Sequence, residues 1–460
     1  MTKFGVNLSA AGMLFFCTVA SCVAQAPSPC PTQVLTSNPT KSADLLCLLP
    51  QVYGAGGLVG ATNGGPLDDT QGHQVHFQAS SIRSFAPINA EIAVELSQLP
   101  IAAPVAGFVF AGGVITPTNS FGPILTDRAE TLGRNKLFVS LSYQYFSFNK
   151  ADGVDLKNFG VVFTHEPEPS VCATGTSVPC LDGEPIYTRD IIATQNRIDL
   201  KVHQFTLVGS YGITDKLDLS LAVPILNVRM GMNSNATIFN FEPPPVNHRF
   251  ANIASPFNAQ FSNSGYSSGM SDITLRTKYA VRQGEKYAVA LGVDFRLPTG
   301  NPYDLLGSGT WGFRPFAIYS GRAGRISPRG TIGFQANGPT VLAGDVTSQP
   351  VTKGYLPNLL TYSVGADVSV SKKVSASTDF IGGSLLHGTK ISTTTFTDFG
   401  GNTHADITTS FATINLASIS AGVKVNPLKN FLITANGLFR LNDAGLHATA
   451  VPLFGLSYTF

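Results

Sequence analysis

Two short motifs in this sequence have residue types that enzymes use for chemistry. Residues 265–269, Gly-Tyr-Ser-Ser-Gly, match the pattern in which a sharp turn from a strand into a helix exposes a nucleophilic serine, here Ser267. Residues 307–312, Gly-Ser-Gly-Thr-Trp-Gly, resemble a dinucleotide-binding motif. No predicted helix follows either motif, so neither can form the structure that its chemistry requires. We predict loops at both places and no catalytic residue.

Histidines are the second candidate for chemistry. His73 and His76 lie near two aspartates, but no helix or hairpin pattern fixes their geometry, so we predict a solvated loop, no metal site and no cofactor. Asp304, His387 and His404 could meet on external loops, which would suit a membrane-embedded hydrolase. The sequence cannot show that they meet.

A larger set of charged residues falls on one face of predicted strands. Within residues 272–279, for example, Arg276 and Lys278 alternate with the apolar Leu275 and Tyr279. A Lys or Arg facing lipid at mid-membrane costs about 2 to 4 kcal/mol, so charges on membrane-spanning strands must face the lumen. They either neutralise one another across neighbouring strands or line a path for solutes. The predicted lumen residues are Asp272, Arg276, Lys278, Asp294, Arg296, Asp367, Asp379 and Arg440.

Long strands are needed to position these residues, and from Leu137 onward the dominant period of hydrophobicity is two. The runs are roughly 10 to 13 residues long, close to the 9 to 11 that cross a membrane at a tilt. Long loops alternate with tight turns such as 214–216 and 283–285, as in outer-membrane barrels. We expect an all-β, antiparallel, up-and-down transmembrane barrel over 137–460, with about twelve strands and at most fourteen. The strands are placed near 137–148, 198–213, 215–229, 271–282, 286–298, 310–322, 325–336, 359–371, 373–385, 411–425, 429–441 and 450–460.

The N-terminus resembles an export signal over residues 1–26, with Lys3 before an apolar stretch and a small-x-small site ending at Ala26. A lipoprotein-type cleavage before Cys22 is the alternative. Residues 27–136 have a different character: short helices are predicted at 42–49 and 126–133. This segment is expected either to plug the barrel or to lie in the periplasm.

Composition narrows the class of partner and the compartment. Charged residues make up only 13% of the chain and the net charge is +2, so no nucleic-acid partner is expected. Beyond the signal, no stretch approaches the roughly 18 apolar residues of a transmembrane helix. An exported chain meets an oxidising periplasm, and the four cysteines that remain suggest the pairs Cys30 with Cys47 and Cys172 with Cys180.

The last strand ends on an aromatic residue. Leu456, Tyr458 and Phe460 form its apolar face, on the side that the loop pattern assigns to the periplasm. This arrangement resembles the C-terminal signal that the barrel-assembly machinery binds.

Three pieces of the strand region share an order with a known family. Residues 269–273 (Gly-Met-Ser-Asp-Ile), 296–300 (Arg-Leu-Pro-Thr-Gly) and 306–309 (Leu-Gly-Ser-Gly) resemble the outer-membrane family named for the meta-pathway of phenol degradation, with Ser271 where that family usually has a glycine. The resemblance covers about residues 195–460. It implies a barrel that passes hydrophobic or aromatic compounds, similar to long-chain fatty acid channels with an N-terminal hatch.

We therefore expect a bacterial outer-membrane channel, not an enzyme, that passes small hydrophobic or aromatic molecules passively. Its expected partners are outer-membrane lipid, the assembly machinery and the solute. A barrel hydrolase and a structural or adhesive barrel with a closed lumen are the alternatives. The sequence leaves the solute, the gating and the oligomeric state open.

Overall fold

The computed structural model describes residues 44–53, 67–68, 77–79, 85–100, 108–111, 114–117, 127–173, 179–241, 248–250, 255–346, 350–428 and 430–460. The predicted signal peptide, with the alternative cleavage at Cys22, lies outside these residues, as do His73, His76 and Cys30.

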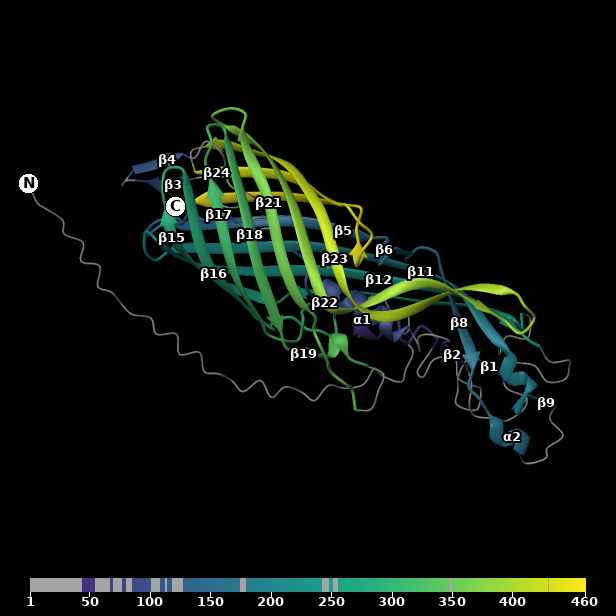
Figure 1. Cartoon of the computed structure of the whole chain (residues 1–460). Coiled ribbons are helices and arrows are strands. Elements are labelled where there is room, and N and C mark those ends of the chain that lie inside the picture. The colour runs from purple at the N-terminus through teal and green to yellow at the C-terminus, as the bar shows by residue number, and fades with distance from the viewer. Residues whose placement is uncertain are drawn as a thin grey trace, which may run out of the picture.

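Twelve strands form a closed antiparallel barrel in the described part of the chain, as the alternation predicted (Figure 1). Each strand pairs with its neighbours in chain order, and the last strand closes the barrel by pairing with the first, with Leu456 opposite Leu141. The barrel strands are β5 (Leu137–Phe148), β11 (Ile191–Gly212), β12 (Leu217–Phe239), β15 (Ile273–Gln283), β16 (Tyr287–Leu297), β17 (Gly312–Gly321), β18 (Ile326–Asn337), β21 (Asn358–Ser369), β22 (Val374–Thr397), β23 (Thr403–Leu428), β24 (Phe431–Arg440) and β26 (Ala450–Thr459).

Short strands and helices belong to the loops and to the N-terminal segment. The helices are η1 (Leu45–Cys47), α1 (Ala86–Leu96), α2 (Pro169–Ala173), η3 (Ile186–Arg189) and η4 (Val341–Ala343). The remaining strands are β1 (Leu67–Asp68), β2 (Phe77–Ala79), β3 (Phe108–Ala111), β4 (Val114–Pro117), β6 (Lys150–Ala151), β7 (Val154–Asp155), β8 (Phe159–His165), β9 (Cys180–Leu181), β10 (Glu184–Pro185), β13 (Arg249–Phe250), β14 (Asn258–Met270), β19 (Pro339–Thr340), β20 (Gly354–Tyr355) and β25 (Leu446–His447). Among the described residues, no helix is both long and apolar enough to span a membrane.

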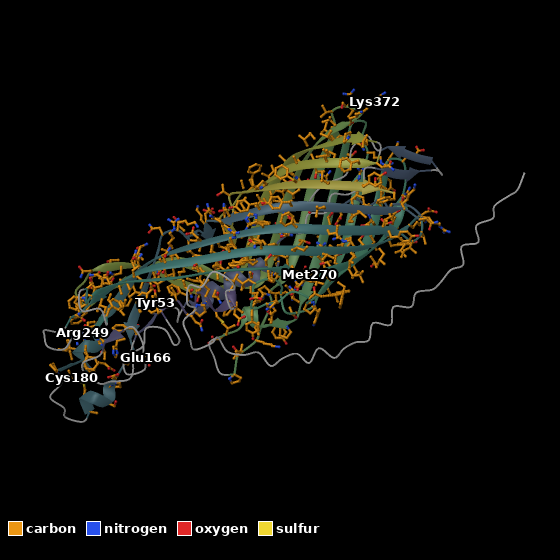
Figure 2. All side chains as sticks on the ribbon, turned by 180° about the vertical axis from the view of Figure 1, so that it is seen from behind. Tyr53, Glu166, Cys180, Arg249, Met270 and Lys372 are labelled. Atoms are coloured by element: carbon orange, nitrogen blue, oxygen red, sulfur yellow. A yellow bond between two sulfur atoms is a disulfide. The ribbon has the colours of Figure 1, made fainter. Side chains whose placement is uncertain are left out.

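The two ends of the barrel differ, as the loop pattern predicted. Tight turns such as 213–216, 284–286 and 370–373 lie at the end that also holds the C-terminus, whereas long loops lie at the other end. Figure 2 shows Lys372 at the turn end and Glu166, Cys180 and Arg249 at the loop end. One expected long loop is different: β22 and β23 continue as a paired hairpin to a turn at 398–402, and β8 packs against its far part.

Side chains alternate between an apolar outer face and a more polar interior. On β16, Leu291 and Phe295 are 53% and 40% exposed on the outside, while Asp294 is only 6% exposed. Outward residues of the last strand, such as Phe454 (54%), follow the same pattern. Because every backbone group of a closed barrel is paired, it can expose apolar side chains to lipid. The described barrel therefore has the apolar outer surface of a membrane-spanning β-barrel.

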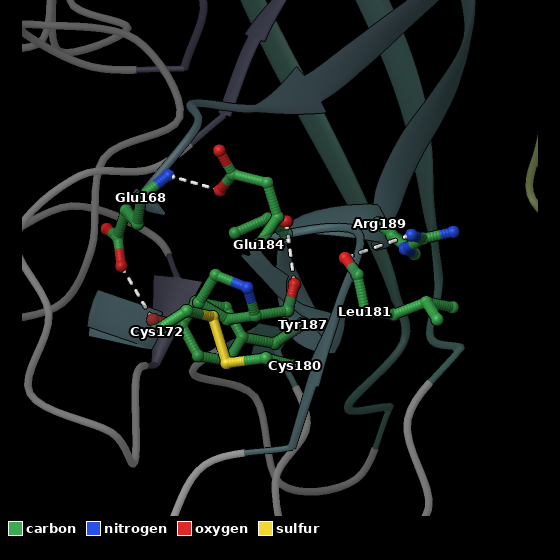
Figure 3. Close-up of a disulfide and its surroundings, with 9 residues drawn as sticks. Glu168, Cys172, Cys180, Leu181, Glu184, Tyr187 and Arg189 are labelled. Carbon is green, nitrogen blue, oxygen red and sulfur yellow. Dashed lines mark hydrogen bonds between the residues drawn. A yellow bond between two sulfur atoms is a disulfide. The ribbon is translucent and has the colours of Figure 1, made fainter. Parts of the chain in front are cut away.

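The loop end carries a folded cap. β8 pairs with β11 and with β2 from the N-terminal segment, and β1 pairs with β13 in the loop after β12. A disulfide joins Cys172 in α2 to Cys180 in β9, one of the two pairs suggested by the sequence (Figure 3). Cys47 is also disulfide-bonded.

Two described parts of the segment before β5, α1 with η1 and residues 127–133, lie against the inside of the barrel and its loops and are called the plug below. β1 and β2 belong to the cap, and β3 and β4 pair with each other at the turn end (Figure 1). Asn89 in α1 donates to the Leu46 carbonyl (2.6 Å), and the Leu46 amide donates to Tyr303 in the β16–β17 loop (2.9 Å). The helix predicted at 126–133 is wrong, because residues 127–133 have no regular secondary structure and Gly133 has a φ of 88°. Their backbone groups bond to the barrel wall instead: Ala129 N donates to Ser320 Oγ at 2.9 Å.

Candidate functional site

A cavity of about 420 Å³ lies in the lumen between the barrel wall and the N-terminal segment. One wall, the aromatic wall, lies near the barrel closure, where Phe146 and Phe148 of β5 pack with Leu438 of β24. Phe138 also lines the cavity, but at the turn end of β5, with the buried polar residues Ser140, Ser142 and Gln144 in between. The opposite wall, on β15 to β18, carries Arg276, Arg296, Arg314 and Thr331. The cavity therefore presents an aromatic side and a basic side, within the 300 to 1,000 Å³ range typical of small-molecule sites.

Two arginines on the basic wall share one carboxylate. Asp294 accepts from Arg276 Nε at 2.6 Å and from Arg314 Nε at 2.9 Å. Arg276 also donates to Asp127 at 2.7 Å, and both guanidinium groups lie over the Phe316 ring, at 4.9 and 5.4 Å from its centroid. The arginines are thus held by fixed partners rather than free in the lumen.

Residues 127–132 run toward the turn end along the inner face of the barrel, and hydrogen bonds to the barrel strands hold them there. Lys278 Nζ donates to the Glu130 carbonyl at 2.7 Å, and Leu132 N donates to Asp218 at 3.1 Å. The Glu130 carboxylate pairs with Arg322 (2.8 Å) and Arg128 (3.3 Å). Burial alone would raise the pKa of Glu130, but these two arginines outweigh it and lower the pKa to about 2. Glu130 therefore stays ionised at any physiological pH.

A second ion-pair cluster lies on β18, β21, β22 and β23. Lys424 donates to Asp367 (2.7 Å), and Arg329 bonds both Asp367 (2.7 Å) and Asp379 (2.5 Å). All four side chains are at most 2% exposed. Two cations thus meet two carboxylates, which satisfies charges buried inside the barrel.

Arg296 is less completely paired than the other arginines on the basic wall. Its nearest carboxylate, Asp272, is 3.7 Å from Nε. Asp272 already accepts from Gly300 N (3.1 Å) and Ser308 N (2.8 Å), and from the Ser308 hydroxyl. Arg296 Nη2 donates to Asn337 (2.8 Å) and Nη1 to the Ser97 carbonyl (3.4 Å), which leaves Nε without a hydrogen-bond partner in the described part of the chain.

Helix α1 brings two glutamates into the lumen. Glu95 Oε2 accepts from the Leu446 amide at 2.6 Å, and both Glu91 and Glu95 are nearly fully buried. Burial raises the pKa of Glu95 to about 7; the Leu446 amide and Arg440 oppose the rise, while Asp152 adds to it. Burial, with Asp152 and Glu95 nearby, raises the pKa of Glu91 well above its usual range. α1 thus docks through carboxyl groups that favour protonation.

The predicted lumen residues fall into two groups in the structure. Five line the cavity: Arg276, Lys278, Asp294, Arg296 and Arg440. Asp272, Asp367 and Asp379 are buried in the ion pairs described above. Sequence reasoning missed Asp218, Arg314, Arg329 and Lys424, although each lies on a predicted strand where the same alternation marks the inner face. Glu95, Asp127 and Glu130 carried no such signal, because they belong to the N-terminal segment.

The motifs that suggested enzyme chemistry have structural roles. The loop predicted at 265–269 is wrong, because Ser267 lies within β14, which pairs with β12. Its hydroxyl donates to the Asp304 carbonyl at 2.6 Å. His404 bonds Asp398 (2.8 Å), whereas Asp304 accepts from Asn301 (2.8 Å), so each has its own local partner. His387 lies at the bulge between Leu385 and Gly388 of β22. No cluster of potential metal ligands occurs in the described ranges.

The C-terminal residues lie on the outer face of the last strand. Leu456, Tyr458 and Phe460 are 46%, 41% and 63% exposed, and the rings of Tyr458 and Phe460 are 4.6 Å apart. Phe460 N donates to the Leu137 carbonyl at 2.8 Å, which ties the C-terminus to the start of β5.

Comparison with known proteins gives one sequence match and several structures of similar fold. The family model described as "Putative MetA-pathway of phenol degradation" matches residues 197–445. No curated protein matches. An outer membrane channel from Pseudomonas putida F1 is 12% identical, covering 74% of this chain and 100% of its own, with a TM-score of 0.42. A FadL homologue from Pseudomonas aeruginosa is 10% identical, covering 71% of this chain and 89% of its own, with a TM-score of 0.30. The P. putida toluene transporter TodX is 9% identical, covering 72% of this chain and 90% of its own, with a TM-score of 0.30.

Proposed function

The chain belongs to the family of the MetA-pathway of phenol degradation, and from that membership we propose that it passes small hydrophobic or aromatic molecules through the barrel lumen, passively, across the outer membrane. The proposal concerns the route and the class of solute. Passive movement is the simplest assumption, because no energy-coupling motif was found near the predicted mature N-terminus.

The aromatic wall of the lumen cavity is the observation that carries this proposal. A barrel whose interior served only to neutralise charge would fill the space between plug and wall with ion pairs. Here Phe146 and Phe148 of β5, with Leu438 of β24, instead give part of the 420 Å³ space an apolar lining. Apolar surface lining a cavity favours apolar solutes by about 25 cal/mol per Å² of surface removed from water.

A bulky residue inside the cavity tests this route. Ala222 of β12 lines the cavity, while its neighbour Leu221 faces outward and is 44% exposed. Ala222→Trp should fill the path, and Leu221→Trp, which places the same indole side chain on the lipid side, is the matched control. Both variants should appear as folded barrels in the outer membrane.

The assay is uptake by cells whose outer leaflet contains lipopolysaccharide, because a simple phospholipid bilayer is no barrier to hydrophobic solutes. Labelled alkylbenzene, alkylphenol and alkylbenzoate should include at least one compound that enters faster when the wild-type protein is present. Ala222→Trp should remove this gain and Leu221→Trp should keep it. The proposed function is wrong if no compound shows a gain, or if both variants transport equally well.

A further inference from the structure

The lumen cavity contains polar atoms that its own surroundings leave without partners. Arg296 is 9% exposed, and its Nε has no hydrogen-bond partner within the described residues. The same is true of both side-chain amide atoms of Gln98 and of Thr331 Oγ1, all of them buried. All three residues line the cavity. Buried polar groups are nearly always hydrogen-bonded, so unpaired ones that share a cavity indicate the place of a ligand's polar group.

Arg296 and Gln98 belong to one corner of this cavity. Arg296 Nη1 donates to the carbonyl of Ser97, the residue before Gln98, at 3.4 Å. Arg296 comes from β16 of the wall, whereas Gln98 directly follows α1 of the plug, separated from it only by Ser97. The corner is thus built from both parts of the molecule, and a ligand bound there would contact both.

The charge of this corner favours an anion. Arg276 and Arg314 are bonded directly to carboxylates, but Arg296 donates only to an amide oxygen and a carbonyl, and Asp272 is shared with three closer donors. Arg440, also in the lining, donates to the carbonyls of Ala444 and Leu446. Of the carboxylates near Arg440, Glu95 is largely protonated below pH 7. Arg296 and Arg440 therefore donate no hydrogen bond to a carboxylate among the described residues, and the one carboxylate paired with Arg296, Asp272, lies 3.7 Å from Nε, beyond hydrogen-bond distance.

We propose that the cavity binds an amphiphilic carboxylate, with its apolar body against Phe146 and Phe148 and its carboxylate on Arg296 Nε and the Gln98 amide. Hydrogen bonds between charged groups are shorter and stronger than neutral ones, and the low dielectric of the cavity strengthens them further. The inference rests on the proposed function, since it names the solute class for the same path.

Binding to the full-length protein in lipid nanodiscs tests the head group. The probes are 4-butylbenzoate and its neutral analogue 4-butylbenzyl alcohol, measured by calorimetry at pH 6 against nanodiscs without protein. The benzoate should bind at least tenfold more tightly than the alcohol. Arg296→Gln should weaken benzoate binding roughly tenfold or more and change alcohol binding by less than about threefold.

Three further variants separate recognition from folding. Arg296→Lys keeps the charge and should retain most of the benzoate affinity, whereas Gln98→Leu should reduce it. Arg325→Gln removes an exposed charge from the turn between β17 and β18 and should have no effect. Equal binding of the two probes, or an Arg296→Gln protein that binds benzoate as the wild type does, would overturn the proposal. Either result leaves the uptake test with Ala222→Trp unaffected, so failure of the head group and failure of the path can be distinguished.

Discussion

Replacing Glu95 by glutamine should make the docking of α1 insensitive to pH at this position. Glu95 lies on the plug helix, and its carboxylate accepts from the Leu446 amide, an interaction that a glutamine oxygen can keep. The charged groups near it are Glu91, Asp152 and Arg440, while β25, which also packs against α1, brings His447. Burial is the largest cause of the shift and raises the pKa of Glu95 from 4.5 to about 7.

The direction of the effect follows from that pKa. Because the docked pKa is higher than the ordinary 4.5, docking is strongest below pH 4.5 and weakens as the pH rises through 7. A displacement of the pKa from 4.5 to about 7 corresponds to roughly 3 kcal/mol, or a change of about 300-fold in the docking equilibrium. Glu91, whose pKa is also raised, acts in the same direction. The plug should therefore be released more often at alkaline pH.

Single-channel recording between pH 4.5 and 8.5 measures this release. The wild-type open fraction should rise across this range, and hydrogen exchange of residues 88–96 should quicken in parallel. Glu95→Gln should remove most of the rise, while Glu285→Gln in the exposed turn after β15 should not. A wild-type open fraction that falls with pH, or a Glu95→Gln protein with the wild-type response, would refute the reasoning.

Three other predictions concern the stability and assembly of the barrel. Lys424→Met removes one cation from a buried cluster in which Arg329 still pairs with both carboxylates. It should cost about 3 to 5 kcal/mol in urea unfolding, against under about 0.5 kcal/mol for Lys372→Met in an exposed turn. Removing the Cys172–Cys180 disulfide should cost the cap about 2 to 3 kcal/mol and quicken hydrogen exchange there, while barrel melting is unchanged. Deleting Phe460 should lower the amount of barrel in the outer membrane more than the uptake per assembled molecule; normal assembly would contradict the predicted C-terminal signal.

The strands could be predicted because lipid and lumen impose opposite demands on neighbouring residues. Leu291 faces the lipid and Asp294 faces the lumen, and the same alternation places the other predicted lumen charges inside the barrel. The rule fails outside the membrane. The far parts of β22 and β23 were expected to be a loop, since a run such as Thr393-Thr394-Thr395 is polar on both faces and gives no alternation.

The plug could not be predicted in the same way, because its conformation depends on the wall. α1 is buried on almost every side, so it lacks the apolar stripe that marks a surface helix. Residues 126–133 have local signals for a helix, but bonds from Ala129 and Leu132 to the barrel replace the helical ones. For the same reason, the sequence did not predict that Asp127 pairs with Arg276 or that Glu130 pairs with Arg322.

The central claim is that solute passes through the lumen cavity, and reversible blocking of that cavity tests it most directly. Ala222→Cys places a thiol in the cavity wall, where a bulky methanethiosulfonate reagent attaches through a bond that a reductant breaks. Uptake should stop on labelling and return on reduction in the same cells, while Leu221→Cys on the outer face should transport throughout; wild-type cells given the reductant control for the native disulfides. Unchanged uptake by fully labelled Ala222→Cys protein would contradict the account.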